Sequence, residues 1–270
     1  MLVGEEFLAK RSTAAPIGKA QKSSEPSEAT AIHTSILRLT LALEESRSYW
    51  QHGDPSVSVP EKTKIAFEQR WFGGKSLHRV QYILRSFASR YDAFPAALNV
   101  LGKWRSMDLS TRQVLCHWHL QLSDPIYRKF TGEYLIQRRD LHDPKVDRAA
   151  VLRWVKAEFP DKWSDSTCVQ FASKLLSAAL EAGLVSKRDP RTLLFPTVPD
   201  HALGYLLYLL RQTRIAGSLT SNPYLASVGL DSEGLRARTL PGVSVRTMMG
   251  LVEFEWAYPN LEAWAREVLP

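Results

Sequence analysis

Cysteine is scarce in this 270-residue chain, with Cys116 and Cys168 as its only two cysteines. Two cysteines do not build a disulfide scaffold and suit a reducing compartment, so we expect a cytoplasmic protein. Residues 1–10 contain Glu5 and Glu6 and no long apolar run, which does not suit a signal peptide. The longest uncharged apolar stretch within an expected helix, residues 202–210, is far shorter than the ~20 residues of a membrane span. We therefore expect no membrane partner.

Enzyme motifs are missing as well. The chain has no phosphate-binding Walker loop, no G-x-G-x-x-G, no H-E-x-x-H and no G-x-S-x-G. The run Cys116-His117-Trp118-His119 resembles a metal motif, but neighbours at this helical spacing do not converge on one ion, and no second Cys/His cluster exists. Asp161-Lys162 and Glu253-x-Glu255 lack the strand-borne carboxylate and lysine set of a metal nuclease. We expect no catalytic residues, no metal and no cofactor.

Positive charge is what the chain has in excess. Lys and Arg number 35 against 28 Asp and Glu, a net charge of +7. Much of this excess falls in residues 61–91, which hold seven Lys or Arg residues and two Glu residues. Such a cluster exceeds ordinary mixing of surface charges and favours a polyanionic partner.

Apolar residues recur at helical spacing from Ile32 onward, and 44% of the chain is hydrophobic. We predict a mainly α fold of two helical lobes with helix-turn-helix and winged-helix elements and one or two short β-hairpins. Residues 1–30 are expected to form a flexible tail or a partly ordered arm, 31–142 the first lobe, and 143–270 a winged-helix lobe (143–198) with a C-terminal helical extension. The expected helices are 34–51, 61–70, 76–91, 93–104, 110–121, 125–139, 144–158, 164–182, 200–215, two short helices within 221–240, and 259–268.

Local signals place the ends of several elements. Asp124-Pro125 and Asp143-Pro144 each predict an N-cap followed by proline in the first helical turn. A polar turn at 186–191 separates the strand-like segments 184–185 and 192–195, which predicts a hairpin, and 251–256 alternates apolar and acidic residues like a further strand.

Residues 61–91 form the first candidate DNA-binding element. A helix, the pair Gly73-Gly74 and a second helix capped by Ser76 match the order of a helix-turn-helix. The second helix is expected to expose a basic face. The residues predicted to contact DNA here are Lys75, Arg79, Arg85 and Arg90. A solvated basic face on an ordinary helical bundle is the alternative.

Residues 143–198 form the second candidate element. Two helices followed by a hairpin follow the order of a winged helix, whose second helix enters the major groove while the wing contacts the backbone. The residues predicted to contact DNA here are Ser166, Thr167, Gln170 and Lys174 on the helix, and Lys187 and Arg188 on the wing. Winged helices also serve as protein–protein adaptors, and this second helix carries little charge.

Three segments resemble the BrxA family of bacteriophage exclusion (BREX) systems: residues 41–47, the two-helix segment around Lys75-Ser76, and residues 163–185. The resemblance covers about residues 32–215. It implies a small, non-enzymatic, all-helical accessory protein that binds double-stranded DNA through helix-turn-helix elements, beside a methyltransferase, an ATPase and a phosphatase-like protein. Cys168 stands where the family pattern has a basic residue.

We therefore predict weakly sequence-specific binding of double-stranded DNA, dominated by phosphate contacts. The alternative is a protein–protein scaffold in a defence complex, in which both helix-turn-helix elements dock partner subunits. Eight Trp residues and the apolar-acidic stretch 251–256 favour this alternative.

Overall fold

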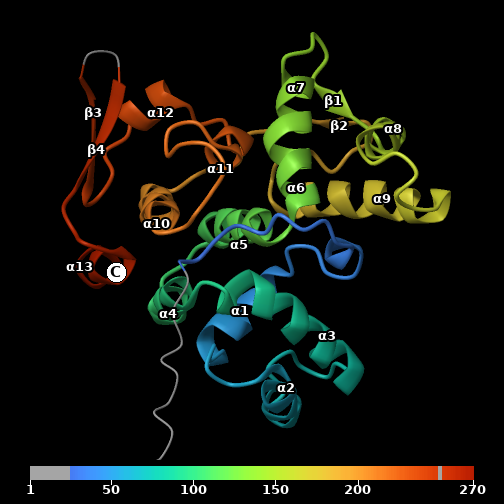
Figure 1. Ribbon diagram of the computed structural model, residues 1–270, viewed down its shortest axis with the longest axis horizontal. Helices are drawn as coiled ribbons and strands as arrows, with labels where there is room; N and C mark the ends of the chain where they lie inside the picture. The colour runs from blue at the N-terminus through green and yellow to red at the C-terminus, as the bar shows by residue number, and fades with distance from the viewer. Residues whose placement is uncertain (1–24, 249–250) are drawn as a thin grey trace, which may run out of the picture.

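The structure, a computed structural model, describes residues 25–248 and 251–270. It is mainly helical with two short two-stranded antiparallel sheets, which confirms the expected fold class (Figure 1). Its helices up to residue 139 are α1 (Leu43–His52), α2 (Val59–Glu68), α3 (Leu77–Phe87), α4 (Pro95–Lys103), α5 (Leu109–Ser123), α6 (Pro125–Lys129) and α7 (Leu135–Arg139). The later helices are α8 (Arg148–Glu158), α9 (Asp165–Glu181), α10 (Asp200–Arg211), α11 (Pro223–Ser227), α12 (Ser232–Arg236) and α13 (Leu261–Val268). Among the described residues, no helix is both long and apolar enough to cross a bilayer.

The centre of the molecule is α5, which lies between the two groups of helices in Figure 1. Its residues from Val114 to Ser123 are all buried, because the helix is covered on every side. One continuous cluster of buried apolar side chains extends from Ile36 to Trp264 and includes residues from both groups of helices. Burial of this apolar surface is the main stabilising contribution to such a fold.

Residues 25–30 are ordered, as in the arm that was one of the two expectations, and do not belong to a flexible tail; residues 1–24 lie outside the described residues. The amide of Ala29 donates to the carbonyl of Leu122 at 2.8 Å. Glu28 is buried, and its carboxylate accepts from the amide of Ala216 at 3.0 Å and from the hydroxyl of Tyr224. These partners are distant in sequence, so no local pattern predicts the contacts.

The expected helix 34–51 is broken. Only a short 3₁₀ turn forms at Ser35–Leu37, and α1 begins at Leu43 after Ala42 adopts a left-handed backbone with a φ of 53°. The carboxylate of Glu181 accepts from the amide of Leu41 at 2.9 Å and from the hydroxyl of Thr40 at 2.7 Å. These bonds replace the hydrogen bonds that a helix would make here. Helical propensity contributes less free energy than such tertiary contacts, so the helix does not form in this segment.

The winged-helix element is present, with one strand more than expected. Strand β1 (Lys145–Val146) pairs antiparallel with β2 (Arg191–Thr192), and Val185 bridges Leu193 beside them. The helix expected from residue 144 therefore starts at Arg148, where the carboxylate of Asp147 accepts from the amide of Ala150 at 2.6 Å. Asp143-Pro144 leads into a strand because β2 offers a hydrogen-bonding edge there.

The C-terminal extension ends in a hairpin and a helix. The strand expected at 251–256 is confirmed as β4 (Leu251–Trp256), and its partner β3 (Val243–Met248) was not anticipated. Their register places Val243 opposite Trp256 and Val245 opposite Phe254. Helix α13 follows and buries Trp264, whose indole N–H donates to the carbonyl of Pro241 at 2.8 Å.

Candidate nucleic-acid interface

Helices α2 and α3 form the first element, a helix-turn-helix around Gly73. Gly73 has a φ of 70°, a left-handed conformation that glycine adopts without strain. The hydroxyl of Ser76 caps α3 by accepting from the amide of Arg79 at 3.4 Å. Val80, Ile83, Leu84 and Phe87 face the core, so the remaining face of α3 is turned outward.

Of the four cations predicted to contact DNA here, three are at least partly exposed, and they differ in the partners that they already have. Arg85 is exposed and makes no ion pair among the described residues. Lys75 is paired with Glu45 at 3.2 Å. Arg79 is half-buried and donates to the carbonyl of Arg38 at 3.0 Å. Only Arg85 therefore offers a wholly free charge.

The expectation that Arg90 lies on the exposed face is wrong. Arg90 is 3% exposed and donates to the carbonyl of Leu41 at 3.0 Å. The reason is a π-helical turn at Ala88–Asp92, which has more residues per turn than an α-helix and so rotates the following side chains out of phase with α3. Lys62 is likewise 1% exposed. The charge count over 61–91 therefore overstates the basic surface.

Helix α9 presents the second element. Its N-cap is Ser164, and of the predicted residues Ser166, Gln170 and Lys174 are exposed while Thr167 is half-buried. The hydroxyls of Ser166 and Thr167 each lie 3.0 Å from that of Ser164. The N-terminal end of α9 projects at the edge of the molecule in Figure 1. This end is accessible to a partner of any size.

The wing carries two exposed cations. Lys187 and Arg188 lie at its tip, and neither makes an ion pair among the described residues. Arg191 at the base donates to the carbonyl of Ser186 at 3.1 Å, which closes the wing loop.

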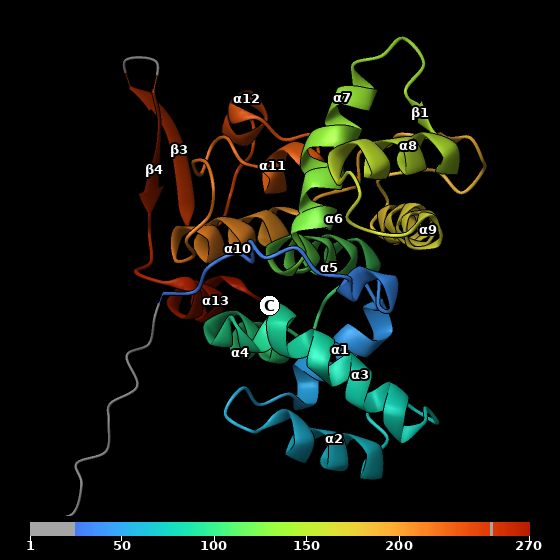
Figure 2. The same cartoon turned by 45° about the vertical axis from the view of Figure 1, so that its right-hand side comes forward.

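The two elements meet in a groove of about 390 Å³, to which Arg79 of α3 and Lys174 of α9 both contribute. Between them lies Arg38, in the segment that passes beneath α9 and above α3 in Figure 2. The guanidinium groups of Arg38 and Arg79 lie 5.2 and 6.0 Å from the ring centroid of Tyr82. Sequence reasoning missed Arg38, since no motif marks it and its segment was expected to be helical.

The groove also contains Glu44, Glu45 and Glu181, so its charge is mixed. The carboxylate of Glu181 is occupied by residues 40–42, and that of Glu45 by Lys75. Glu44 is the acid left least engaged, with 73% of its side chain exposed. Lys187 and Arg188 do not line the groove, so the wing cations are separate from the groove cations Arg38, Arg79 and Lys174.

The residues of the run Cys116–His119 are buried among partners from different elements. His117 contacts the hydroxyls of Tyr127 and Ser227 at 2.8 and 2.9 Å, while His119 contacts the carbonyl of Arg90 at 3.1 Å and the hydroxyl of Tyr205 at 2.7 Å. Burial lowers the pKa of His117 to about 3 and that of His119 to about 4, so both are neutral. Within the described ranges, no three His, Cys, Asp or Glu residues come together as metal ligands.

No protein-family model and no curated protein matches this chain. Among solved structures, it is similar to the crystal structure of an uncharacterized protein from Magnetospirillum magneticum. The two are 16% identical and align with a TM-score of 0.54 over 67% of this chain and 97% of the other. At this identity, the similarity shows a shared fold alone.

Proposed function

We propose that this protein binds double-stranded DNA as a non-enzymatic accessory protein of a bacterial BREX anti-phage system, in the cytoplasm. The observation that carries the proposal is the arrangement around α9. The N-terminal half of α9 carries exposed polar residues, the wing that follows α9 carries the exposed cations Lys187 and Arg188, and the groove beside α9 contains Arg38, Arg79 and Lys174. The defence role rests on the resemblance to the BrxA family.

Phosphate contacts dominate the proposed binding mode. The exposed residues of α9 include Ser166, Gln170 and the single cation Lys174, with Thr167 half-buried beside them. Their hydroxyl, amide and ammonium groups donate to phosphate oxygens, and Gln170 and Lys174 are also residue types that contact base edges. The cations of the groove and of the wing would add contacts to the DNA backbone. We expect affinity to vary little with DNA sequence.

The experiment is duplex binding across a salt series with three double variants. Reversing two phosphate-contacting cations, in Lys187→Glu/Arg188→Glu or in Arg79→Glu/Arg85→Glu, should reduce the slope of log affinity against log salt by about 1.8. The matched control is Arg214→Glu/Arg246→Glu, which changes the net charge equally at side chains 78% and 65% exposed and outside both elements. Wild-type affinity that is insensitive to salt, or an equal loss in the control, would show that the proposal is wrong.

A protein–protein scaffold is the second candidate, and an exposed apolar patch favours it. Leu141, Leu194 and Phe195 are 48%, 42% and 62% exposed. Arg139 joins this region by donating to the carbonyl of Leu194 at 2.7 Å and by covering the ring of Phe195 at 4.3 Å. Under this alternative, partner subunits stay bound after nuclease treatment and are released by Phe195→Asp. DNA-mediated association has the opposite outcome in both respects.

A further inference from the structure

A second pocket, away from both DNA-binding elements, has a wall composed of hydrogen-bond donors. It measures about 430 Å³ and lies between α1, the C-terminal end of α4 and the start of α5. Arg47 and Trp50 line it from α1, Trp104 and Arg105 from the residues after α4, and Arg112 from α5. A volume of this order is typical of pockets for small molecules.

The charge of this pocket is positive on all sides. Three guanidinium groups line it, and no Asp or Glu residue does. Arg47 and Arg105 are exposed and have no ion pair within the described part of the chain. Arg112 has a contact of 3.8 Å with Glu44, but that carboxylate is 73% exposed and largely screened by water.

The other nearby acid is already engaged. Asp108 is the N-cap of α5, and its carboxylate accepts from the amide of Thr111 at 2.7 Å and from the hydroxyl of Ser110 at 3.0 Å. The charge of Arg112 is among the causes that lower the pKa of Asp108, after the hydrogen bonds to Thr111 and Ser110. Asp108 is therefore committed to the helix and does not line the pocket.

Three buried donors around this pocket have no acceptor among the described residues: the indole Nε1 of Trp50, the indole Nε1 of Trp104 and the Nε of Arg112. Trp50 and Trp104 are only 3% and 6% exposed. Buried donors in folded proteins almost always have a partner, because an unmade hydrogen bond costs the full desolvation of the group. All three donors belong to residues that line the cationic pocket, which favours a ligand rich in acceptors.

The walls of the pocket are held rigidly. Gly102 allows α4 to approach α1 closely, since a Cβ at that position would lie 2.5 Å from the carbonyl oxygen of Trp50. The ring of Trp50 packs edge-on against Tyr91 with centroids 5.8 Å apart, and that of Trp104 packs against Tyr205 at 6.2 Å. The two rings are therefore already fixed before a ligand binds, which reduces the entropy lost on binding.

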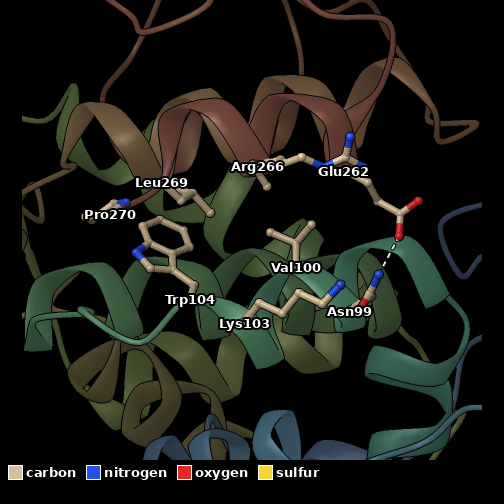
Figure 3. A pocket seen from close by; sticks show the side chains of 9 residues that line it. Asn99, Val100, Lys103, Trp104, Glu262, Arg266, Leu269 and Pro270 are labelled. Atoms are coloured by element: carbon tan, nitrogen blue, oxygen red, sulfur yellow. Dashed lines mark hydrogen bonds between the residues drawn. The ribbon is translucent and has the colours of Figure 1, made fainter.

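A neighbouring pocket provides the contrast. Figure 3 shows it between α4 and α13, with Trp104 forming one wall. Its volume is about 240 Å³. Glu262 lines this pocket together with Lys103 and Arg266, and its carboxylate accepts from the side-chain amide of Asn99 at 2.6 Å. The charge of this pocket is therefore mixed, which favours an anion less than a lining with cations alone. The cationic pocket on the other side of Trp104 has no carboxylate in its lining.

We propose that the pocket between α1, α4 and α5 binds a small phosphorylated molecule. The guanidinium groups of Arg47, Arg105 and Arg112 hold the phosphate, because a planar guanidinium fork matches the oxygens of phosphate. This site is independent of the proposed DNA binding.

The test is calorimetric titration with inorganic pyrophosphate, AMP and adenosine. We expect pyrophosphate and AMP to bind and adenosine, which lacks phosphate, not to bind. The variant Arg47→Gln/Arg105→Gln should bind pyrophosphate and AMP at least tenfold more weakly. The control variant Arg214→Gln/Arg246→Gln should bind both with the affinity of the wild type. All four positions are exposed, so the variants should fold, which thermal unfolding checks. Absence of phosphate binding, equal binding of adenosine, or unchanged affinity in Arg47→Gln/Arg105→Gln would overturn the proposal.

Measuring duplex binding as well distinguishes a small phosphorylated molecule from the phosphates of the DNA backbone. If the pocket serves a small molecule, Arg47→Gln/Arg105→Gln leaves duplex affinity within twofold of the wild type. If duplex affinity falls as far as in Lys187→Glu/Arg188→Glu, the pocket contacts the DNA backbone and the small-molecule proposal is wrong. Failure of the wild type to bind duplex affects only the proposed function, since the titrations above do not depend on it.

Discussion

Replacing Lys62 by methionine tests whether this lysine holds α2 in place and does not face DNA. Lys62 is 1% exposed, and its ammonium group donates to the hydroxyl of Tyr49 at 3.0 Å and to the carboxylate of Asp92. The hydroxyl of Tyr49 donates to the other carboxylate oxygen. This network ties α2 to α1 and to the π-helical turn that follows α3.

The magnitude follows from what each substitution leaves behind. Lys62→Met keeps the aliphatic volume but leaves the carboxylate of Asp92, 14% exposed, without its cation. Breaking a buried ion pair costs about 3–5 kcal/mol, and the partial exposure of Asp92 places this variant near 3 kcal/mol. Asp92→Asn strands the more deeply buried ammonium group and should cost about 4–5 kcal/mol. Tyr49→Phe removes a single hydroxyl and should cost about 1 kcal/mol.

The assay is urea unfolding followed by circular dichroism. The matched control is Lys64→Met, two residues along α2 on its exposed side, which should change the free energy of unfolding by less than about 0.5 kcal/mol. The double variant Lys62→Met/Asp92→Asn should lose less than the sum of the single variants, because each partner is already uncompensated in the other background. A loss below about 1 kcal/mol in Lys62→Met, or strict additivity in the double variant, would refute the role assigned to the network.

Two further predictions concern buried polar groups. Burial lowers the pKa of His119 to about 4, below the ~6.5 of an unfolded chain, so the unfolded state binds the proton first as pH falls. Between pH 6 and pH 5, urea unfolding should therefore show that the wild type loses about 1.2 kcal/mol more stability than His119→Gln. Equal losses in the two proteins would contradict this. Glu181→Ala should cost about 2–3 kcal/mol, because it leaves the amide of Leu41 and the hydroxyl of Thr40 without their acceptor. Urea unfolding checks the loss of stability, and the hydrogen exchange of the Leu41 amide should become faster in this variant. An unchanged exchange rate would show that Glu181 does not hold this segment.

Local signals were sufficient for most of the helices. Ser76 caps α3 as the sequence indicates, because an N-cap needs only its own side chain and the amide three residues on. The polar turn after α9 likewise predicted the wing. In contrast, the pairing of β1 with β2 joins residues about 45 positions apart, a separation that no local pattern describes. The start of α8 shifted by four residues for that reason.

Charge is where sequence and structure differ most. Composition established an excess of positive charge and located it in residues 61–91, but a side chain's exposure depends on the phase of its helix and on what packs against it. The π-helical turn directs Arg90 toward the core, and Lys62 is buried in an ion pair with Asp92. Arg38 lies beside α3 although its segment is distant in sequence. The groove shared by Arg79 and Lys174, and the cationic pocket at Trp50 and Trp104, exist only through such long-range packing. The amount of charge and the capped ends of helices were therefore local properties of the chain, whereas the surface that charge forms was decided by tertiary contacts.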